Sequence, residues 1–143
     1  MFFNIHTNTD LFEFVANSDK DYVLAHCISA DYVLGGGVAV EFVKRYDMRN
    51  KLRMVGRGTY PACIKIGNIY NLVTKEKVWH KPTYQTVRET LEELRDKMLT
   101  SNEKFLAIPK IACGLDGLDW EKVQQLIVAV FWQTDITIDV CLL

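Results

Sequence analysis

Leu34-Gly35-Gly36-Gly37-Val38-Ala39 is the first of two glycine-rich stretches that decide the fold of this chain. The second is Ile111-Ala112-Cys113-Gly114-Leu115-Asp116-Gly117. Each follows an apolar run typical of a strand and precedes a helical pattern. At such a junction an α/β protein presents backbone N–H groups and a helix N-terminus to an anion. We call these stretches the first and second loops, and together they predict a cleft for a diphosphate or a nucleotide.

The segments around the loops alternate between strand and helix patterns. Apolar runs of strand length predict strands at 2–5, 22–28, 62–66, 68–74, 105–108 and 136–142, with a hairpin about Gly67. Helical spacing predicts a helix directly after the first loop and two more behind the capping residues Thr83 and Asp119. In the helix after Thr83 the apolar residues share one face: Val87, Leu91, Leu94 and Met98.

This order of elements indicates the fold class. No repeat, low-complexity tract or linker rich in Pro, Gly and Ser interrupts it, so we expect residues 1–143 to form a single domain. Strands that alternate with helices predict an α/β fold, in which a mixed, mostly parallel sheet is covered on both faces. Ligands bind such sheets at the carboxyl ends of the strands, where both loops fall.

The composition is that of a soluble globular protein, with 143 residues that are 49% hydrophobic and 24% charged. The formal net charge of -1 provides neither a broad basic field for duplex nucleic acid nor a polybasic membrane handle. The first residues lack the pattern of a signal peptide, and no apolar run approaches membrane-spanning length. We therefore expect a monomer without membrane contact, cytoplasmic or intracellular in a host cell.

The cysteines and histidines do not show metal-ligand spacing, and we expect no metal and no cofactor. Four scattered cysteines without a C-x-x-C pair are typical of reduced core thiols: Cys27, Cys63, Cys113 and Cys141. Cys113 stands in the second loop, so a nucleophilic role is an alternative, although no histidine is near it in the sequence. We interpret His26 as a hydrogen-bonded histidine at a buried strand end and His80 as a loop residue. Three aromatic residues could stack on the adenine or ribose of a nucleotide, but aromatic residues beside helix starts more often pack in the core, and we expect that here: Trp79, Tyr84 and Trp120.

Several motifs together carry a family resemblance. They are His26-Cys27-Ile28-Ser29 before the first loop, Thr74-Lys75, His80-Lys81-Pro82-Thr83-Tyr84, and the run from Pro109 through the second loop to Trp120. In this combination the chain resembles a macro domain, and more narrowly the terminal ADP-ribose protein glycohydrolase branch of that family. The resemblance runs from Asp10-Leu11-Phe12 to the closing strand at 136–142. It implies a three-layer α/β/α architecture.

The resemblance implies that the ligand is ADP-ribose. Asp10 matches an aspartate that accepts a hydrogen bond from the adenine amino group, whereas its position alone indicates a turn or helix-cap aspartate before Leu11. Gly35, Gly36 and Gly37 would wrap the distal ribose and the diphosphate, because residues without Cβ let the backbone approach closely. The other contacts that the resemblance implies are Leu11, His26, Ser29, Val38, Ala112, Cys113, Gly114, Leu115 and Gly117.

Lys75 and Asp116 are the catalytic residues that the resemblance implies. The lysine would attack the anomeric carbon of the distal ribose, and the aspartate would act as acid and base. A lysine is protonated at neutral pH, so it must first lose a proton, which burial favours. Taken alone, Lys75 is a surface lysine and Asp116 a turn aspartate. The expected activity is an ADP-ribosyl glycohydrolase acting on ester-linked protein adducts or on nucleic-acid adducts, with deacylation of O-acyl-ADP-ribose by the same pocket.

Two departures from the family pattern bear on the mechanism. Ile28-Ser29-Ala30-Asp31 stands where many macro domains carry an asparagine for the distal ribose, which favours the lysine route. The segment before Asp10 lacks the glycine common there, which weakens the inferred adenine contact. Three alternatives stay open at this point. They are a reader module that binds ADP-ribose without turnover, an ADP-ribose 1''-phosphate phosphatase, and a small hydrolase that uses Cys113.

Overall fold

A single six-stranded sheet forms the middle of the molecule. The computed structural model describes residues 1–56 and 58–143. The strand order is β1-β6-β5-β2-β4-β3, and only the β3–β4 pair is antiparallel. The expected mixed, mostly parallel sheet is confirmed. Its strands are β1 (Phe2–His6), β2 (Tyr22–Ser29), β3 (Ala62–Ile66), β4 (Ile69–Lys75), β5 (Phe105–Ile108) and β6 (Thr137–Cys141).

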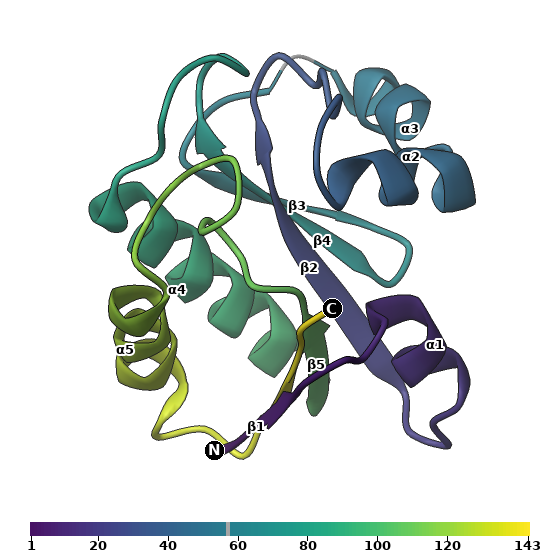
Figure 1. Cartoon of the computed structure of the whole chain (residues 1–143), viewed down its shortest axis with the longest axis vertical. Helices are drawn as coiled ribbons and strands as arrows, with labels where there is room; N and C mark the ends of the chain where they lie inside the picture. The colour runs from purple at the N-terminus through teal and green to yellow at the C-terminus, as the bar shows by residue number, and fades with distance from the viewer. Residues whose placement is uncertain (57) are drawn as a thin grey trace.

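Helices cover both faces of this sheet, as Figure 1 shows. On one face lie α4 (Tyr84–Thr100) and α5 (Trp120–Phe131), and on the other lie α1 (Leu11–Ala16), α2 (Ala39–Tyr46) and α3 (Met48–Val55). Each layer buries its own apolar cluster against the sheet. The three-layer α/β/α architecture is therefore confirmed. Within the described residues, no helix combines the length and the apolar character needed to cross a membrane.

The local patterns explain why these helices form where they do. Thr83 accepts a hydrogen bond from the Thr86 backbone N–H at 3.0 Å, and Asp119 caps α5 in the same way through Glu121. The apolar face of α4 is fully buried at Val87, Leu91, Leu94 and Met98. The same stretch of α4 carries a partly exposed pair, Glu93 with Lys97, whose charged atoms lie 3.4 Å apart.

Three elements depart from the sequence expectation. The first is the short helix α1, for which the sequence indicated only Asp10 as a turn or cap residue. Helix α3 was not predicted, because only Met48 and Leu52 are buried along it and the remaining residues are mostly polar or exposed. Asp47, with a φ of 53°, separates it from α2 by a single left-handed residue. The final strand does not close the sheet, because β1 pairs in parallel with β6 and becomes the outer strand. That pairing joins the two ends of the chain, which local patterns cannot reveal.

The strand ends bring the two loops together. Strand β2 runs directly into the segment before the first loop, β5 runs into the second loop, and β2 pairs with both β4 and β5. A register shift at Ile28 sets Ser29 opposite Lys75, the last residue of β4. Ser29, Lys75 and the two loops thereby lie together at the carboxyl ends of the strands.

Candidate active site

An ion pair between Lys75 and Asp116 stands at the carboxyl ends of the strands. The lysine Nζ lies 2.8 Å from Asp116 Oδ1, and the side chains are each 13% exposed. The same Nζ donates to the backbone carbonyl of Val78 at 3.0 Å. A charged pair that is mostly withdrawn from water is costly unless its groups are satisfied. The two contacts of the ammonium fix its position in the resting protein.

A network around Asp31 holds the segment that follows Lys75. The Val78 backbone N–H donates to Asp31 Oδ2 at 2.9 Å, and the Ser29 hydroxyl donates to Asp31 Oδ1 at 2.5 Å. Although burial alone would raise it, these hydrogen bonds keep the pKa of Asp31 below its ordinary value. Ala30 completes the junction, because its N–H donates to the Lys75 carbonyl at 2.9 Å. Asp31 is therefore a positioning residue that the sequence analysis missed.

The first loop is anchored by helix α3. Arg49 donates through its guanidinium to the Val33 carbonyl at 2.9 Å and to the Leu34 carbonyl at 3.2 Å. Gly37 has a φ of +59°, a conformation in which glycine is not strained. The first residue before α2, Val38, provides no side-chain cap. The loop thus leads into an uncapped helix N-terminus, the arrangement that the sequence predicted for anion binding.

The second loop is held from the start of α4. Lys81 Nζ donates to the Leu115 carbonyl at 2.5 Å, and the Tyr84 hydroxyl accepts from the Asp119 N–H at 3.0 Å. Gly117, with a φ of +75°, closes a turn by donating to Gly114 at 3.1 Å. These contacts give the His-Lys-Pro-Thr-Tyr motif a physical role, because they fix the loop that carries Asp116.

The two loops meet at Gly36 and Leu115. A Cβ added at Gly36 would lie 2.7 Å from Leu115 Cδ1, so the leucine side chain rests on the glycine backbone. Leu115 is nevertheless exposed. Gly35, Gly114 and Ala112 lie in the same two loops, with Ala112 in a left-handed conformation and mostly buried. Both halves of the expected cleft are thus adjacent, and their contacts with a ligand remain predictions.

Asp10 acts as a helix cap in this structure. Its Oδ1 accepts from the N–H groups of Phe12 and Glu13, both at 2.9 Å, at the start of α1. These bonds use one carboxylate oxygen and leave Oδ2 for a further donor. Leu11 beside it is buried. The capping role and the expected adenine contact are therefore compatible, and the second stays a prediction.

Three side chains differ from what the sequence indicated. His26 is fully buried, stacks on Phe42 with ring centroids 3.9 Å apart and contacts Asn71 Oδ1 at 2.6 Å. Its predicted contact with the ligand is wrong for this structure, because it has no exposed surface, whereas its interpretation as a hydrogen-bonded strand histidine is confirmed. Ser29 is also buried, and its hydroxyl donates a hydrogen bond to Asp31. Trp79 is not a core residue, since it is 73% exposed.

The surroundings of the cysteines argue against a reactive thiol. Burial raises the pKa of Cys113 to about 11, and it raises the pKa of Cys27 even further. A neutral thiol is a poor nucleophile, which argues against the cysteine hydrolase. All four cysteines are free. In the described part of the chain, no group of His, Cys, Asp and Glu side chains is arranged to hold a metal ion.

Known proteins similar to this chain point to one family. The chain is 40% identical over 120 residues to the ADP-ribose glycohydrolase OARD1 of Homo sapiens and of Bos taurus, which covers 82% of this chain and 79% of those proteins. No family model matches the sequence.

Solved structures agree on the fold. The macrodomain of Mycobacterium tuberculosis DarG matches 99% of this chain and 98% of its own with a TM-score of 0.85 and 22% identity. Thermosipho africanus DarTG in complex with ADP-ribose matches 98% of this chain and 42% of its own, with a TM-score of 0.74 and 16% identity. Given the identity to OARD1 over most of both chains, this chain belongs to the macro-domain family, in its glycohydrolase branch.

Proposed function

We propose that this protein is a hydrolase that removes ADP-ribose from ester linkages to acidic side chains, with Lys75 as nucleophile and Asp116 as acid and base. The observation that carries the proposal is the 2.8 Å contact between these side chains at the carboxyl edge of the sheet. Two loops rich in glycine meet beside it. The 40% identity to proteins named ADP-ribose glycohydrolase gives further support.

In this proposal ADP-ribose spans the edge of the sheet. The adenine amino group donates to the free oxygen of Asp10, and the diphosphate lies between the first and second loops against backbone N–H groups. Leu115 must move off Gly36 to admit it, which an exposed leucine side chain can do by changing rotamer. The distal ribose then lies over Lys75.

The reaction begins with proton transfer inside the ion pair. In the free protein Lys75 Nζ donates a hydrogen bond to Asp116 Oδ1. A bound ribose excludes water, and loss of water favours the neutral forms of both groups. The proton of Lys75 Nζ therefore passes to Asp116 Oδ1 along the existing hydrogen bond. The lysine becomes a neutral amine next to the anomeric carbon.

Two displacements complete the turnover. The amine attacks C1'', the bond from C1'' to the ester oxygen breaks, and Asp116 gives its proton to the leaving carboxylate. Asp116, now ionised, takes a proton from water as the water oxygen attacks C1''. The bond between Nζ and C1'' breaks, and Asp116 returns the proton to the amine. The products are ADP-ribose and an unmodified acidic side chain.

The same pair is suited to an acyl ester on the distal ribose, so we extend the proposal to O-acyl-ADP-ribose. Adducts of nucleic acid are a further substrate class, because an enzyme of this design recognises mainly the ADP-ribose.

The test compares the wild type with Lys75→Ala, Asp116→Ala and Lys44→Ala, an exposed lysine of α2 that serves as control. Each is incubated with glutamate-linked, serine-linked and DNA-linked ADP-ribose and with O-acetyl-ADP-ribose, and release is followed by mass spectrometry. We expect glutamate-ester cleavage to fall at least about 100-fold in the two site variants, the usual effect of removing an acid–base or nucleophilic group. Binding of free ADP-ribose, measured by calorimetry, should persist in Lys75→Ala.

Other outcomes would identify the alternatives. Full activity of Lys75→Ala would remove the covalent route. Binding without turnover by the wild type would indicate a reader, and release of inorganic phosphate from ADP-ribose 1''-phosphate alone would indicate a phosphatase.

A further inference from the structure

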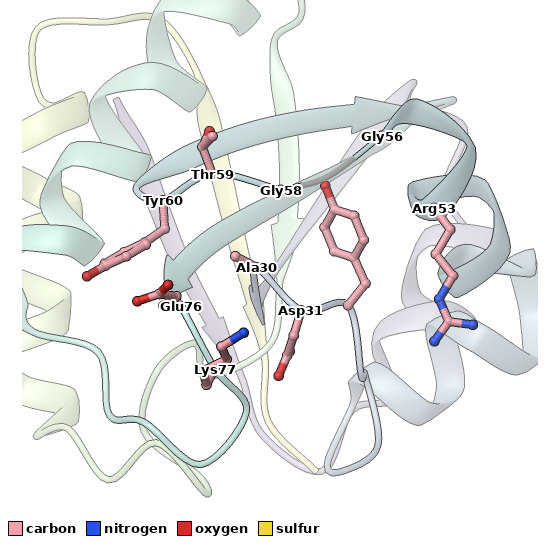
Figure 2. A pocket seen from close by; sticks show the side chains of 10 residues that line it. Ala30, Asp31, Arg53, Gly56, Gly58, Thr59, Tyr60, Glu76 and Lys77 are labelled. Atoms are coloured by element: carbon pink, nitrogen blue, oxygen red, sulfur yellow. The ribbon is translucent and has the colours of Figure 1, made fainter.

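A cavity opens beside Lys75, on the side of the sheet that carries α3. It has a volume of about 610 Å³, and its lining begins at Ala30 and Glu76, the residues that follow β2 and β4. Ala30 donates its N–H to the Lys75 carbonyl at 2.9 Å, so the cavity starts one residue from the nucleophile of the proposed mechanism. None of the residues assigned to ADP-ribose lines it. Figure 2 shows Arg53 and Tyr60 on opposite sides, with Glu76 and Lys77 nearer to Tyr60.

Among the described residues, the charged side chains that line this cavity differ in the contacts they make. Asp31 is engaged by Ser29 and Val78. By contrast, within residues 1–56 and 58–143 neither Arg53 nor Lys77 takes part in an ion pair. Glu76 likewise lacks one among these residues. Among the described residues, Arg53, Lys77 and Glu76 are thus available to a ligand.

Aromatic and backbone groups shape the remaining walls. Tyr32 is buried, and its hydroxyl lies against Gly58, where an added Cβ would come within 2.9 Å of both the hydroxyl and the Ala30 carbonyl. Position 58 can therefore pack against the end of β2 only as glycine. Tyr60, which is 46% exposed, presents its ring at the opposite side. Such a combination of ring surface and charge is typical of sites that bind a polar chain.

We propose that this cavity is the leaving-group subsite, and that it binds the polypeptide segment that carries the modified acidic side chain. The inference rests on the proposed function, because an ester of a carboxylic acid places the rest of the substrate on the far side of C1'' from the diphosphate. A peptide matches the mixed lining, since its backbone N–H groups can donate to Glu76 and its acidic side chains can pair with Arg53 and Lys77. A nucleic-acid strand fits less well, because its successive phosphates would be repelled by the carboxylates of Glu76 and Asp31. The protein, with a formal net charge of -1, has no excess of positive charge to offset that repulsion.

The experiment uses one ester in three settings. ADP-ribose is linked to a glutamate in a short peptide with acidic neighbours, in the same peptide with those neighbours changed to glutamine, and in a single glutamate blocked at both ends. The enzymes are the wild type, Arg53→Gln, Lys77→Gln and the control Lys51→Gln, an exposed residue of α3 that does not line the cavity. Thermal unfolding and ADP-ribose affinity establish that each variant is folded.

We expect the wild type to cleave the acidic peptide with a kcat/KM about tenfold above that of the blocked glutamate, the size of one good charge contact. Arg53→Gln and Lys77→Gln should reduce this preference, and cleavage of the blocked glutamate should be unchanged. Lys51→Gln should behave as the wild type. The neutral peptide should be nearly indifferent to Arg53→Gln, because the partner charge is missing.

Contrary results separate the two proposals. The subsite would be overturned if Arg53→Gln and Lys77→Gln lowered kcat/KM equally on the acidic peptide and on the blocked glutamate, or lowered it on neither. It would also be overturned if Lys51→Gln lowered kcat/KM on the acidic peptide as much as these variants do. The subsite would also be overturned if Arg53→Gln slowed cleavage of an ADP-ribosylated oligonucleotide but did not slow cleavage of the acidic peptide. A wild type that releases nothing from the blocked glutamate contradicts the proposed function. The subsite can then be tested by binding alone. Calorimetry would compare the affinity of the acidic peptide adduct with that of free ADP-ribose, for the wild type and for Arg53→Gln.

Discussion

At the scale of single residues, the site consists of Lys75 and Asp116 together with the groups that hold these two side chains in position. The Val78 carbonyl touches the Lys75 ammonium, and Val78 is itself held by Asp31. Lys81 and Tyr84 hold the second loop, which carries Asp116, through hydrogen bonds to backbone groups. The motif pattern could indicate Lys75 and Asp116 because their types suit the chemistry. It could not indicate the Val78 carbonyl, since a backbone acceptor leaves no mark in the sequence.

His26 provides a residue-scale prediction about stability. Burial lowers its pKa to about 4 from an ordinary value of about 6.5, so the folded state favours the neutral ring. The unfolded chain therefore binds the proton first as the pH falls. We expect the free energy of unfolding to decrease by up to about 3 kcal/mol between pH 6.5 and pH 4 on account of this residue.

Urea unfolding at pH 7, 6, 5 and 4 checks this expectation. His26→Gln keeps an amide that can form a hydrogen bond with Asn71. We expect this variant to be less stable than the wild type at pH 7. Its free energy of unfolding should nevertheless change less than that of the wild type between pH 6.5 and pH 4. Parallel curves for the two proteins would refute the assignment.

At the scale of elements, the alternation of strands and helices was readable because periodicity is local. The capped starts of α4 and α5 and the hairpin of β3 and β4 lie where their capping and turn residues predicted. Helix α3 escaped prediction because two buried side chains in eight residues give little periodic signal. Its function is nonetheless clear in the structure, since Arg49 ties it to the first loop.

Two glycines of equal geometry allow a matched test of the first loop. Gly37 and Gly67 have φ values of +59° and +60°, and a Cβ at either would meet nothing within 4 Å. Changing either to alanine should cost about 1 kcal/mol of stability, because the left-handed region is unfavourable for a residue with Cβ. Only Gly37→Ala should also weaken ADP-ribose binding, because Gly67 lies in the hairpin turn.

Chemical unfolding and calorimetry measure the two effects. Equal ADP-ribose affinities for Gly37→Ala and Gly67→Ala would mean that the first loop does not shape the diphosphate site.

At the scale of the whole molecule, the site is a product of strand order. Lys75 and Asp116 are 41 residues apart and meet because β2 lies between β4 and β5, so that the ends of all three strands share one edge. Spacing alone could not predict this contact, and the family pattern was needed to pair the two residues. The parallel pairing of β1 with β6 was hidden for the same reason, because it joins residues from opposite ends of the chain.

The central claim is that the Lys75 amine bonds to C1'' during turnover, and trapping that bond tests it most directly. The enzyme is mixed with glutamate-linked ADP-ribose in the presence of a mild hydride reductant, which would reduce the open-chain imine form of the adduct, and is then digested and mapped by mass spectrometry. We predict an ADP-ribose adduct on Lys75 that forms only with substrate and is absent from Lys75→Ala. Wild-type turnover without any adduct, or with an adduct confined to Cys113 or to another lysine, would contradict the account.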